Sequence, residues 1–288
     1  IENGIAYIGA SDHTFRAVNI CTGEVKWAFA GVRGYIETKP LVTDNKVIFG
    51  AWDNTLYALN KADGKELWKW TGGLTRMHFS PAAVWPVAAD GKVFITDPQR
   101  AMTAIDIETG NTVWRTFQSM VRETIGLSED KERIYSKTMN DSIVCYSTKG
   151  NQPHKLWASN VGFGYEHAPS MQVEKNGVVF GSTKEGLIFA LEAATGKVLW
   201  KHKTGNSLIS TVVPLDNNAF FLPDFPVDAE LKYKDNLINA YDNSIRYTDN
   251  FLARLIRMLQ EQDIDAAMLY TSDHGEDLSL IHISEPTR

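Results

Sequence analysis

Four segments of this chain share one frame of eleven residues, and this frame constrains the fold more than any other feature. The segments are residues 17–27, 58–68, 104–114 and 190–200. In each segment Ala stands first, Asn, Asp or Glu third, Gly seventh and Trp eleventh. A fifth, looser copy at residues 145–157 begins with Cys and is two residues longer. The repeat tryptophans, Trp27, Trp68, Trp114, Trp157 and Trp200, therefore follow one another at intervals of 41, 46, 43 and 43 residues.

Short apolar runs divide each period into strand-like pieces. The runs that open the periods are residues 5–8, 47–49, 93–95, 134–135 and 178–180. Small or polar residues follow, then a second run, then a turn whose Gly can take a positive φ without a Cβ clash. The Trp lies on a third strand, and a fourth is expected near residues 36–42, 81–87, 124–127, 168–173 and 210–215. Four strands in a period of this length predict a β-propeller.

The predicted fold class is mainly β, with an incomplete propeller of five four-stranded blades plus the start of a sixth. We expect this domain to occupy residues 1–221. A large flat side chain at one fixed position per blade can fill the space between neighbouring blades. We therefore interpret the five repeat tryptophans as inter-blade packing, with ligand stacking by one of them as the alternative.

The frame also resembles a known repeat. Ala-x-(Asn/Asp)-x-x-(Thr/Asp)-Gly-x-x-x-Trp after a Val-x-(Phe/Ile)-Gly-type strand is similar to the pyrroloquinoline-quinone-type propeller repeat. That family includes quinoprotein alcohol dehydrogenases, a propeller lipoprotein of outer-membrane assembly, and propellers attached to bacterial phosphoesterases. Most members with only the bare repeat bind no quinone, so the resemblance implies a non-catalytic binding or scaffold module. We assign no catalytic or cofactor-binding residue to the propeller, and a quinoprotein dehydrogenase remains an alternative.

The repeat stops after Phe221, and a different pattern follows. Between residues 231 and 263 apolar side chains recur every three or four residues, which predicts one amphipathic helix or two. Residues 266–270 form a short apolar run, and the polar cluster at residues 271–277 comes directly after it. A helix, a buried strand and a polar cluster at the carboxyl end of that strand favour a short α/β fragment over residues 222–278.

Two stretches of this fragment resemble the lipid A phosphoethanolamine transferases of the alkaline-phosphatase/sulfatase superfamily. They are residues 239–249 and the segment 269–276, which contains Ser-Asp-His-Gly-Glu. The resemblance implies that Asp273 and His274 bind a catalytic zinc ion, and both residue types are ordinary zinc ligands. In the family this zinc activates a threonine nucleophile. The alternative is a loop Asp-His pair that caps the following helix.

The fragment lacks much of what that chemistry requires. The acidic ligand and the threonine nucleophile of the family should lie well upstream, where this chain has propeller, and further histidines should follow Glu276. Two ligands without a nucleophile cannot carry out the transfer. We therefore predict that this polypeptide has no transferase activity and binds zinc weakly at most. The competing hypothesis is an active zinc-dependent transferase or hydrolase of this superfamily.

The last ten residues, 279–288, resemble a translated sequencing adapter, and a polar protein tail is the alternative. Together with the interrupted propeller, this leads us to interpret the joint near residues 221–226 as the meeting of two unrelated reading frames. A natural fusion is the competing interpretation. The chain also begins in the middle of a blade, so any signal peptide is expected upstream of residue 1.

Composition narrows the choice of partners. The net charge is −6 without a basic run, which gives nucleic-acid binding no support. The sequence has no apolar stretch of eighteen residues, so we expect no membrane span in this chain. The two cysteines, Cys21 and Cys145, lie in different repeats and do not indicate a disulfide framework. Both resemblances imply a periplasmic or cell-envelope protein.

Propellers bind ligands at the central channel or on one face. Polar residues of the predicted inner segments could line the channel mouth: Glu37, Lys39, His78, Ser80, Arg122, Glu123, Glu166, His167, Ser207 and Ser210. Such a mixed-charge set suits an unidentified protein, a peptide or a polar ligand, and a solvated channel wall is the alternative. Three tryptophans outside the frame, Trp52, Trp70 and Trp85, could form a protein-docking face or pack at edges and in the interior.

Overall fold

The computed structural model describes residues 1–72, 85–97, 99–122, 125–163, 170–183, 185–203, 212–214 and 220–221. The chain divides into two compact units, Ile1–Leu237 and Ile238–Arg288. All described residues belong to the first unit. The predicted helix and strand of residues 231–270 lie outside the described residues.

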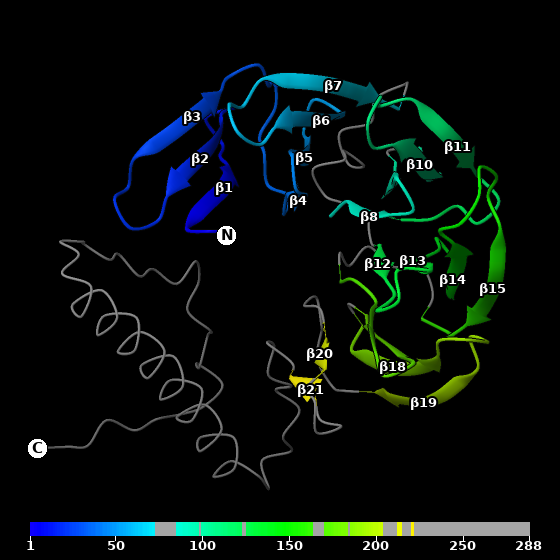
Figure 1. Ribbon diagram of the computed structural model, residues 1–288. Coiled ribbons are helices and arrows are strands. Elements are labelled where there is room, and N and C mark those ends of the chain that lie inside the picture. Colours follow the sequence, from blue (N-terminus) through cyan, green and yellow to red (C-terminus); the bar gives the residue numbers. More distant parts are fainter. Residues whose placement is uncertain are drawn as a thin grey trace, which may run out of the picture. The chain divides into compact units, whose positions relative to one another are not determined.

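The first unit is built from antiparallel sheets that follow one another in sequence order (Figure 1). Blade 1 has three strands: β1 (Ile5–Gly9), β2 (Phe15–Asn19) and β3 (Val25–Phe29). Blade 2 has four: β4 (Leu41–Val42), β5 (Lys46–Ala51), β6 (Thr55–Asn60) and β7 (Glu66–Thr71). Blade 3 also has four: β8 (Val87–Ala89), β9 (Lys92–Thr96), β10 (Met102–Asp106) and β11 (Thr112–Thr116).

Two more four-stranded sheets follow, and a sixth sheet begins. Blade 4 holds β12 (Gly126–Leu127), β13 (Arg133–Lys137), β14 (Ser142–Ser147) and β15 (Lys155–Asn160). Blade 5 holds β16 (Val173–Lys175), β17 (Val178–Ser182), β18 (Leu187–Glu192) and β19 (Val198–Lys203). The short strands β20 (Val213–Pro214) and β21 (Phe220–Phe221) pair with each other. Five blades and the start of a sixth are thus confirmed.

The strands are grouped differently from the sequence periods. Each predicted fourth strand pairs with the hairpin that comes after it, as β4 pairs with β5, and not with the hairpin before it. The reason is that the chain leaves each sheet at its outer strand and enters the next sheet at the inner edge, as Figure 1 shows for β7 and β8. Blade 1 consequently has three strands among the described residues.

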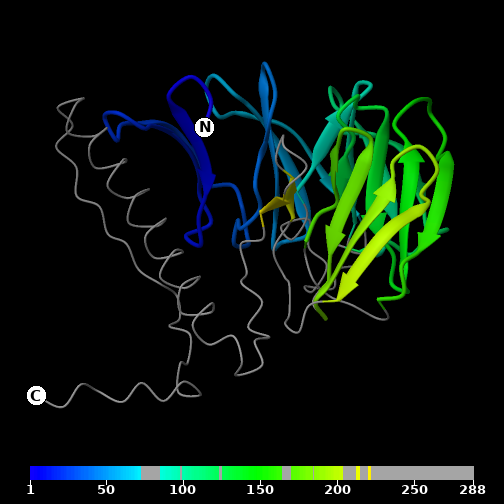
Figure 2. The same ribbon diagram turned by 90° about the horizontal axis from the view of Figure 1, so that it is seen from below.

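The strands of each blade run up and down in Figure 2, so the loops gather at two ends. One end carries the turns between first and second strands and between third and fourth strands. We call it the turn end. The other end carries the hairpins between second and third strands and the connections from one blade to the next. We call it the connection end.

The turn between the third and fourth strands explains the repeat frame, and we call it the docking turn. In blade 3 the side-chain Oδ1 of Asp106 accepts the backbone N–H groups of Glu108 (3.1 Å) and Thr109 (2.8 Å). Gly110 then adopts a φ of +74°, which L-residues rarely take. The Ala of the frame pairs with the Trp of the next strand, as Ala104 does with Trp114, and the register shifts just after it.

Repeat tryptophans join neighbouring blades at three of the contacts between sheets, which we call seams. Each donates its indole N–H, over 3.0 Å, to a backbone carbonyl in the docking turn of the next blade. The pairs are Trp27 with Lys61, Trp68 with Ile107 and Trp157 with Ala193. The Gly of the turn lies against the ring, because a Cβ on Gly64, Gly110 or Gly196 would come within 2.5–2.7 Å of ring carbons. Inter-blade packing by these tryptophans is confirmed.

The seam between blades 3 and 4 is different. Trp114 is only 5% exposed, yet its Nε1 has no hydrogen-bond partner among the described residues. Its ring lies 6.3 Å from that of Tyr146, measured between centroids. Gly150, in the docking turn of blade 4, has a φ of +80°, and an added Cβ there would meet no described atom within 4 Å. The two extra residues of the fifth copy lengthen this turn and separate it from the tryptophan.

Candidate binding face at the connection end

Exposed apolar side chains gather on the connections between blades. Tyr35 precedes β4, Trp85 precedes β8, and Phe117 and Met120 lie between β11 and β12. Their exposed fractions are 51%, 40%, 51% and 50%. Since every connection returns from an outer strand to an inner one, all four residues belong to the connection end. We call this group the aromatic face.

Two of the predicted channel residues contact tryptophans at the connection end. The Oε2 atom of Glu37 accepts the indole N–H of Trp52 over 2.7 Å. The Nζ atom of Lys39 lies 5.4 Å from the ring centroid of Trp85, which is within the range of a cation–π contact. Glu37 therefore contacts a tryptophan in the β5–β6 hairpin of blade 2, and Lys39 contacts a tryptophan at the entry to blade 3.

Arg115 lies against the ring of Phe117. Its Nε donates to Oδ2 of Asp97 over 2.6 Å, and the Asp97 side chain is fully buried. The guanidinium carbon lies 5.1 Å from the Phe117 ring centroid and 6.0 Å from that of Trp70. Trp70 is itself buried and donates to Oγ1 of Thr112 over 2.9 Å, so it packs in the interior. The Phe117 ring thus lies within cation–π range of a guanidinium group that is paired with a buried carboxylate.

Arg122, another predicted channel residue, is buried at 6% exposure. Its Nη1 lies 3.7 Å from the sulfur of Met139, and its carbonyl accepts the hydroxyl of Ser136. Nearby, Nζ of the buried Lys137 donates to Oγ of Ser170 over 2.7 Å. Lys137 joins blades 4 and 5, because it ends β13 and Ser170 precedes β16, whereas these contacts of Arg122 lie with residues of blade 4.

A groove of about 300 Å³ opens beside Met120 at the seam of blades 3 and 4. Its lining is mainly hydroxyl, amide and thioether side chains, with one cation: Gln118, Ser119, Met120, Thr138, Met139, Asn140, Ser142, Val144, Lys155 and Ala158. The hydroxyl oxygens of Ser119 and Tyr146 are 2.8 Å apart next to it. The groove therefore lies between the β11–β12 connection and blade 4, beside Met120 of the aromatic face.

Burial and hydrogen bonds shift the pKa values of several titratable groups in the described blades. Burial raises the pKa of the Cys145 thiol, which keeps it protonated and a poor nucleophile. Burial, followed by its hydrogen bond to Asp53, raises the pKa of Tyr57. Burial also raises the pKa of Tyr135, with a further contribution from its hydrogen bond to Glu174. Conversely, the guanidinium of Arg16 lowers the pKa of Asp12.

Metal-binding residues are not found in this part of the molecule. Among the described residues no three His, Cys, Asp or Glu side chains group closely enough to hold a metal ion. Asp273 and His274 lie outside the described residues, so the zinc site stays a prediction. The same holds for seven channel candidates: His78, Ser80, Glu123, Glu166, His167, Ser207 and Ser210. Nor does any helix in the described ranges have the length and apolarity to cross a bilayer.

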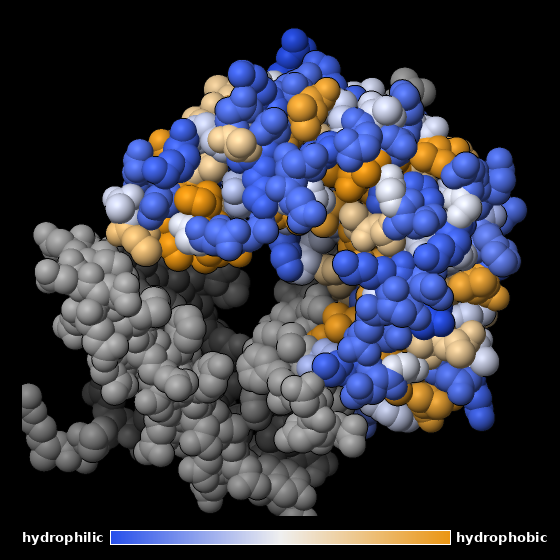
Figure 3. Space-filling view, in the orientation of Figure 1, coloured by the Kyte–Doolittle hydropathy of each residue, from blue (hydrophilic) through white to orange (hydrophobic). Residues whose placement is uncertain are grey.

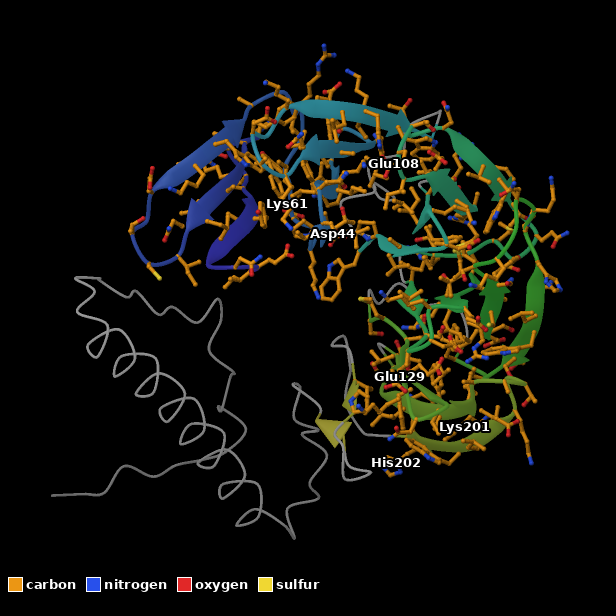
Figure 4. All side chains as sticks on the ribbon, in the orientation of Figure 1. Asp44, Lys61, Glu108, Glu129, Lys201 and His202 are labelled. Carbon is orange, nitrogen blue, oxygen red and sulfur yellow. The ribbon has the colours of Figure 1, made fainter. Side chains whose placement is uncertain are left out.

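Sequence reasoning did not single out Tyr35, Phe117 or Met120. Each is a large apolar residue in a connection outside the repeat frame, and that position was the available signal. The turn end differs from the connection end in the polarity of its surface residues. Figure 4 labels Asp44, Lys61, Glu108 and Glu129 on its turns, and Figure 3 shows hydrophilic residues over much of the visible face in the same orientation.

Two family models match the chain. The model for outer membrane protein assembly factor BamB matches residues 1–151, and the sulfatase model matches residues 145–285. The second match overlaps blades 4 and 5 as well as residues 279–285, so it does not locate the junction between the two parts. The blades over residues 142–203 nevertheless follow the propeller repeat in their pairing and register.

Individual relatives support both parts. The chain is 26% identical over 250 residues to a tetrathionate hydrolase of Acidithiobacillus ferrooxidans, covering 72% of this chain and 48% of that protein. It is 44% identical over 66 residues to phosphoethanolamine transferase EptA of Helicobacter pylori, covering 23% and 13% respectively. The chain thus spans less than half the length of these curated relatives.

A solved structure supports the fold. The crystal structure of BamB from Moraxella catarrhalis superposes with a TM-score of 0.60 at 18% identity, covering 77% of this chain and 64% of that one. At that identity the likeness shows the propeller fold alone. With the BamB family model matched over residues 1–151 of 288, the chain belongs to the BamB family of pyrroloquinoline-quinone-type propellers, and it carries a sulfatase-family segment resembling phosphoethanolamine transferases.

Proposed function

We propose that residues 1–221 form a non-catalytic binding or scaffold module of a bacterial cell-envelope protein. The module takes an extended segment of another protein on the aromatic face. The observation that carries this proposal is the exposure of Tyr35, Trp85, Phe117 and Met120 on connections at one end of the blades. Aromatic residues and Met are enriched at protein interfaces, where they bury large areas at low entropic cost.

Further features support binding over catalysis. The buried thiol and phenols are held in their protonated forms by burial, which leaves no activated nucleophile among them. The cations Arg115 and Lys39 lie beneath or beside aromatic rings and shape the surface. Membership of a family described by an outer-membrane assembly factor supports an envelope location and a protein partner.

The test uses a labelled ten-residue peptide with alternating aromatic and polar residues, the pattern of outer-membrane strands. Fluorescence anisotropy measures its binding to the full chain. We expect Trp85→Ser combined with Phe117→Ser to weaken binding about tenfold or more. Leu67→Ser combined with Leu156→Ser alters two similarly exposed residues on outer strands and should leave binding unchanged. No binding by the parent chain, or equal loss in the control, contradicts the proposal.

The division into domains remains part of this proposal: 1–221 propeller, 222–278 sulfatase-like fragment, and 279–288 an unrelated tail. Limited proteolysis followed by mass spectrometry tests it. We expect the protected core to end between residues 203 and 226. A protected fragment that runs through residue 278 would show instead that the two parts fold as one body.

We further propose that the sulfatase-like fragment is inactive in this chain, because Asp273 and His274 supply two zinc ligands without a nucleophile. Incubation of the zinc-supplemented protein with fluorescent phosphatidylethanolamine should give no transfer product. The active alternative is supported if product forms and disappears in Asp273→Ala combined with His274→Ala. Added pyrroloquinoline quinone should likewise keep its absorption band unshifted, and a shift would favour the dehydrogenase alternative.

A further inference from the structure

The groove beside Met120 has walls that hydrogen bonds hold in place. The β11–β12 connection turns at Met120, whose N–H donates to the carbonyl of Phe117 over 3.2 Å. The carbonyl of Met120 accepts the N–H of Met139 over 3.0 Å, and Val121 forms a β-bridge with Thr138. The connection from blade 3 is therefore tied to the β13–β14 hairpin of blade 4, and both segments line the groove.

The hairpin itself is braced by Thr138. Its N–H donates to the carbonyl of Ser142 over 2.9 Å, and its hydroxyl donates to the carbonyl of Asn140 over 2.7 Å. The same hydroxyl oxygen accepts the N–H groups of Asn140 and Ser142 over 3.2 and 3.3 Å. Since bonds within the chain fix both sides of the groove, its backbone needs little ordering when a partner binds.

The described lining of the groove divides into an apolar part and a polar part. Val144 and Ala158 are paired across β14 and β15, so their side chains lie on the same face of the sheet. The thioethers of Met120 and Met139 complete the apolar part. Val144 and Met139 are buried, whereas Met120 is half exposed and belongs to the aromatic face. The apolar part is thus continuous with that face.

The polar part consists, among the described lining residues, of hydroxyl and amide groups and the ammonium group of Lys155. The amides of Gln118 and Asn140 can each donate and accept hydrogen bonds, whereas the ammonium group only donates. At about 300 Å³ the groove is at the lower limit of small-molecule pockets. A groove of this size and mixed lining suits one amphipathic side chain of a longer segment.

We propose, on the basis of the function proposed above, that this groove takes one tyrosine side chain of the partner segment. The phenol ring packs on the two thioethers and on Val144, and contacts between thioether sulfur and aromatic rings are favourable. Its hydroxyl both donates and accepts, which matches the amides of Gln118 and Asn140. Because alternate side chains of an extended segment point to the same side, the next aromatic ring can lie on Phe117.

Other side chains match the groove less well. Phenylalanine supplies the ring but offers the polar part no hydrogen bond. Glutamate can pair with Lys155, but its carboxylate then lies against the apolar surface of Val144 and Met139, where the burial of charge is unfavourable. Tyrosine is complementary to both parts of the lining.

The test compares three labelled ten-residue peptides with alternating aromatic and polar residues, whose binding to the full chain is measured by fluorescence anisotropy. One has tyrosine at every aromatic position, one has phenylalanine there, and one has glutamate in place of the central tyrosine. We expect the tyrosine peptide to bind about tenfold more tightly than either of the others. Gln118→Ala combined with Asn140→Ala should make the tyrosine and phenylalanine peptides bind equally.

Filling the groove gives a matched comparison. Ala158→Leu places a larger side chain in the groove and should weaken binding of the tyrosine peptide about tenfold or more. Ala28→Leu makes the same change at an exposed alanine of β3, again directly after a repeat tryptophan, and should leave binding unchanged. Circular dichroism checks that all variants are folded.

Methionine methyl groups report where the peptide binds. In the chain labelled with ¹³C at these methyls, the ring current of a bound tyrosine should shift the NMR signals of Met120 and Met139. Met102 is fully buried in blade 3, and its signal should not move.

Equal affinity of the parent chain for the tyrosine and phenylalanine peptides, tighter binding of the glutamate peptide, an equal loss in Ala28→Leu, or unshifted Met120 and Met139 signals overturns this proposal. The proposed function still stands in that case if Trp85→Ser combined with Phe117→Ser weakens peptide binding. If none of the peptides binds the parent chain, the proposed function and this proposal fall together.

Discussion

The seam between blades 2 and 3 and the seam between blades 3 and 4 come from the same repeat but use their tryptophans differently. At the first, Trp68 is hydrogen-bonded to Ile107 and covered by Gly110. At the second, Trp114 is equally buried, but its indole N–H has no partner among the described residues, and Gly150 is remote from it. Burial alone therefore does not define the contact. The length of the docking turn does, because it places the carbonyl and the Gly against the ring.

The strongest contrast is expected at the glycines of these turns. Gly110→Ala should lower the free energy of unfolding by about 1–2 kcal/mol through backbone strain at its positive φ. The clash of the new Cβ with Trp68 should lower the free energy of unfolding of this variant by roughly 1–3 kcal/mol more. Gly150→Ala carries only the first cost, because its Cβ has open space. Urea unfolding measures both, and equal losses in the two variants would refute the difference between the seams.

Removal of the indole N–H should give the next largest difference in stability loss between the two seams. Trp68→Phe leaves the carbonyl of Ile107 without its donor and should cost about 1–2 kcal/mol more than Trp114→Phe, which deletes a buried group that has no acceptor. Both substitutions remove a similar volume, so the difference between them reports the hydrogen bond. Calorimetric unfolding of the two variants gives that difference. A larger loss for Trp114→Phe would contradict the account.

An ion pair at the docked seam gives a smaller effect. Nζ of Lys46 is 2.6 Å from Oε2 of Glu108, and the lysine side chain is only 4% exposed. Glu108→Gln should cost about 1 kcal/mol, because it leaves a buried ammonium group poorly compensated while solvent screens the exposed glutamate. Glu132→Gln breaks the exposed pair with Lys149 and should cost less than about 0.5 kcal/mol. Unfolding in low and high salt compares the two.

The smallest effect concerns pH. Hydrogen bonds from Thr109, its backbone N–H first, lower the pKa of Asp106. A lowered carboxyl pKa adds stability above the unfolded value of about 4, and this stability is lost as pH falls through the folded value. Asp106→Asn keeps an acceptor, as Asn60 does in blade 2, and should remove this part of the acid sensitivity. Unfolding midpoints between about pH 2 and 6 measure it, and an unchanged slope would contradict it.

Much of the fold follows from local sequence. The Asn or Asp, the Gly and the Trp of the frame each have one evident physical task, and together they predict the turn, its conformation and the contact with the next blade. Blade boundaries are harder to predict from the sequence, because the inner strands are only two or three residues long among the described residues. Such strands, for example β4 and β12, carry too little periodicity to show which hairpin they join.

The candidate site was less predictable. The sequence predicts Glu37 and Lys39 as polar residues near the channel mouth. Their contacts depend on loops distant in sequence, because Trp52 lies in the β5–β6 hairpin of the same blade and Trp85 lies at the entry to the next blade. The place of Arg122 in a predicted inner segment makes it a channel candidate from the sequence, yet it is buried against Met139. The unpaired indole of Trp114 could be traced to the two extra residues of the fifth copy only once the seam was visible.

Exchange of the indole protons with solvent, followed by NMR on the ¹⁵N-labelled chain, tests the central claim most directly. Docked tryptophans should exchange slowly, so we predict slow exchange at Trp27, Trp68 and Trp157 and faster exchange at Trp114, although it is just as buried. Exchange at Trp68 and Trp157 as fast as at the exposed Trp85, or at Trp114 as slow as at Trp68, would contradict a propeller joined by docked tryptophans.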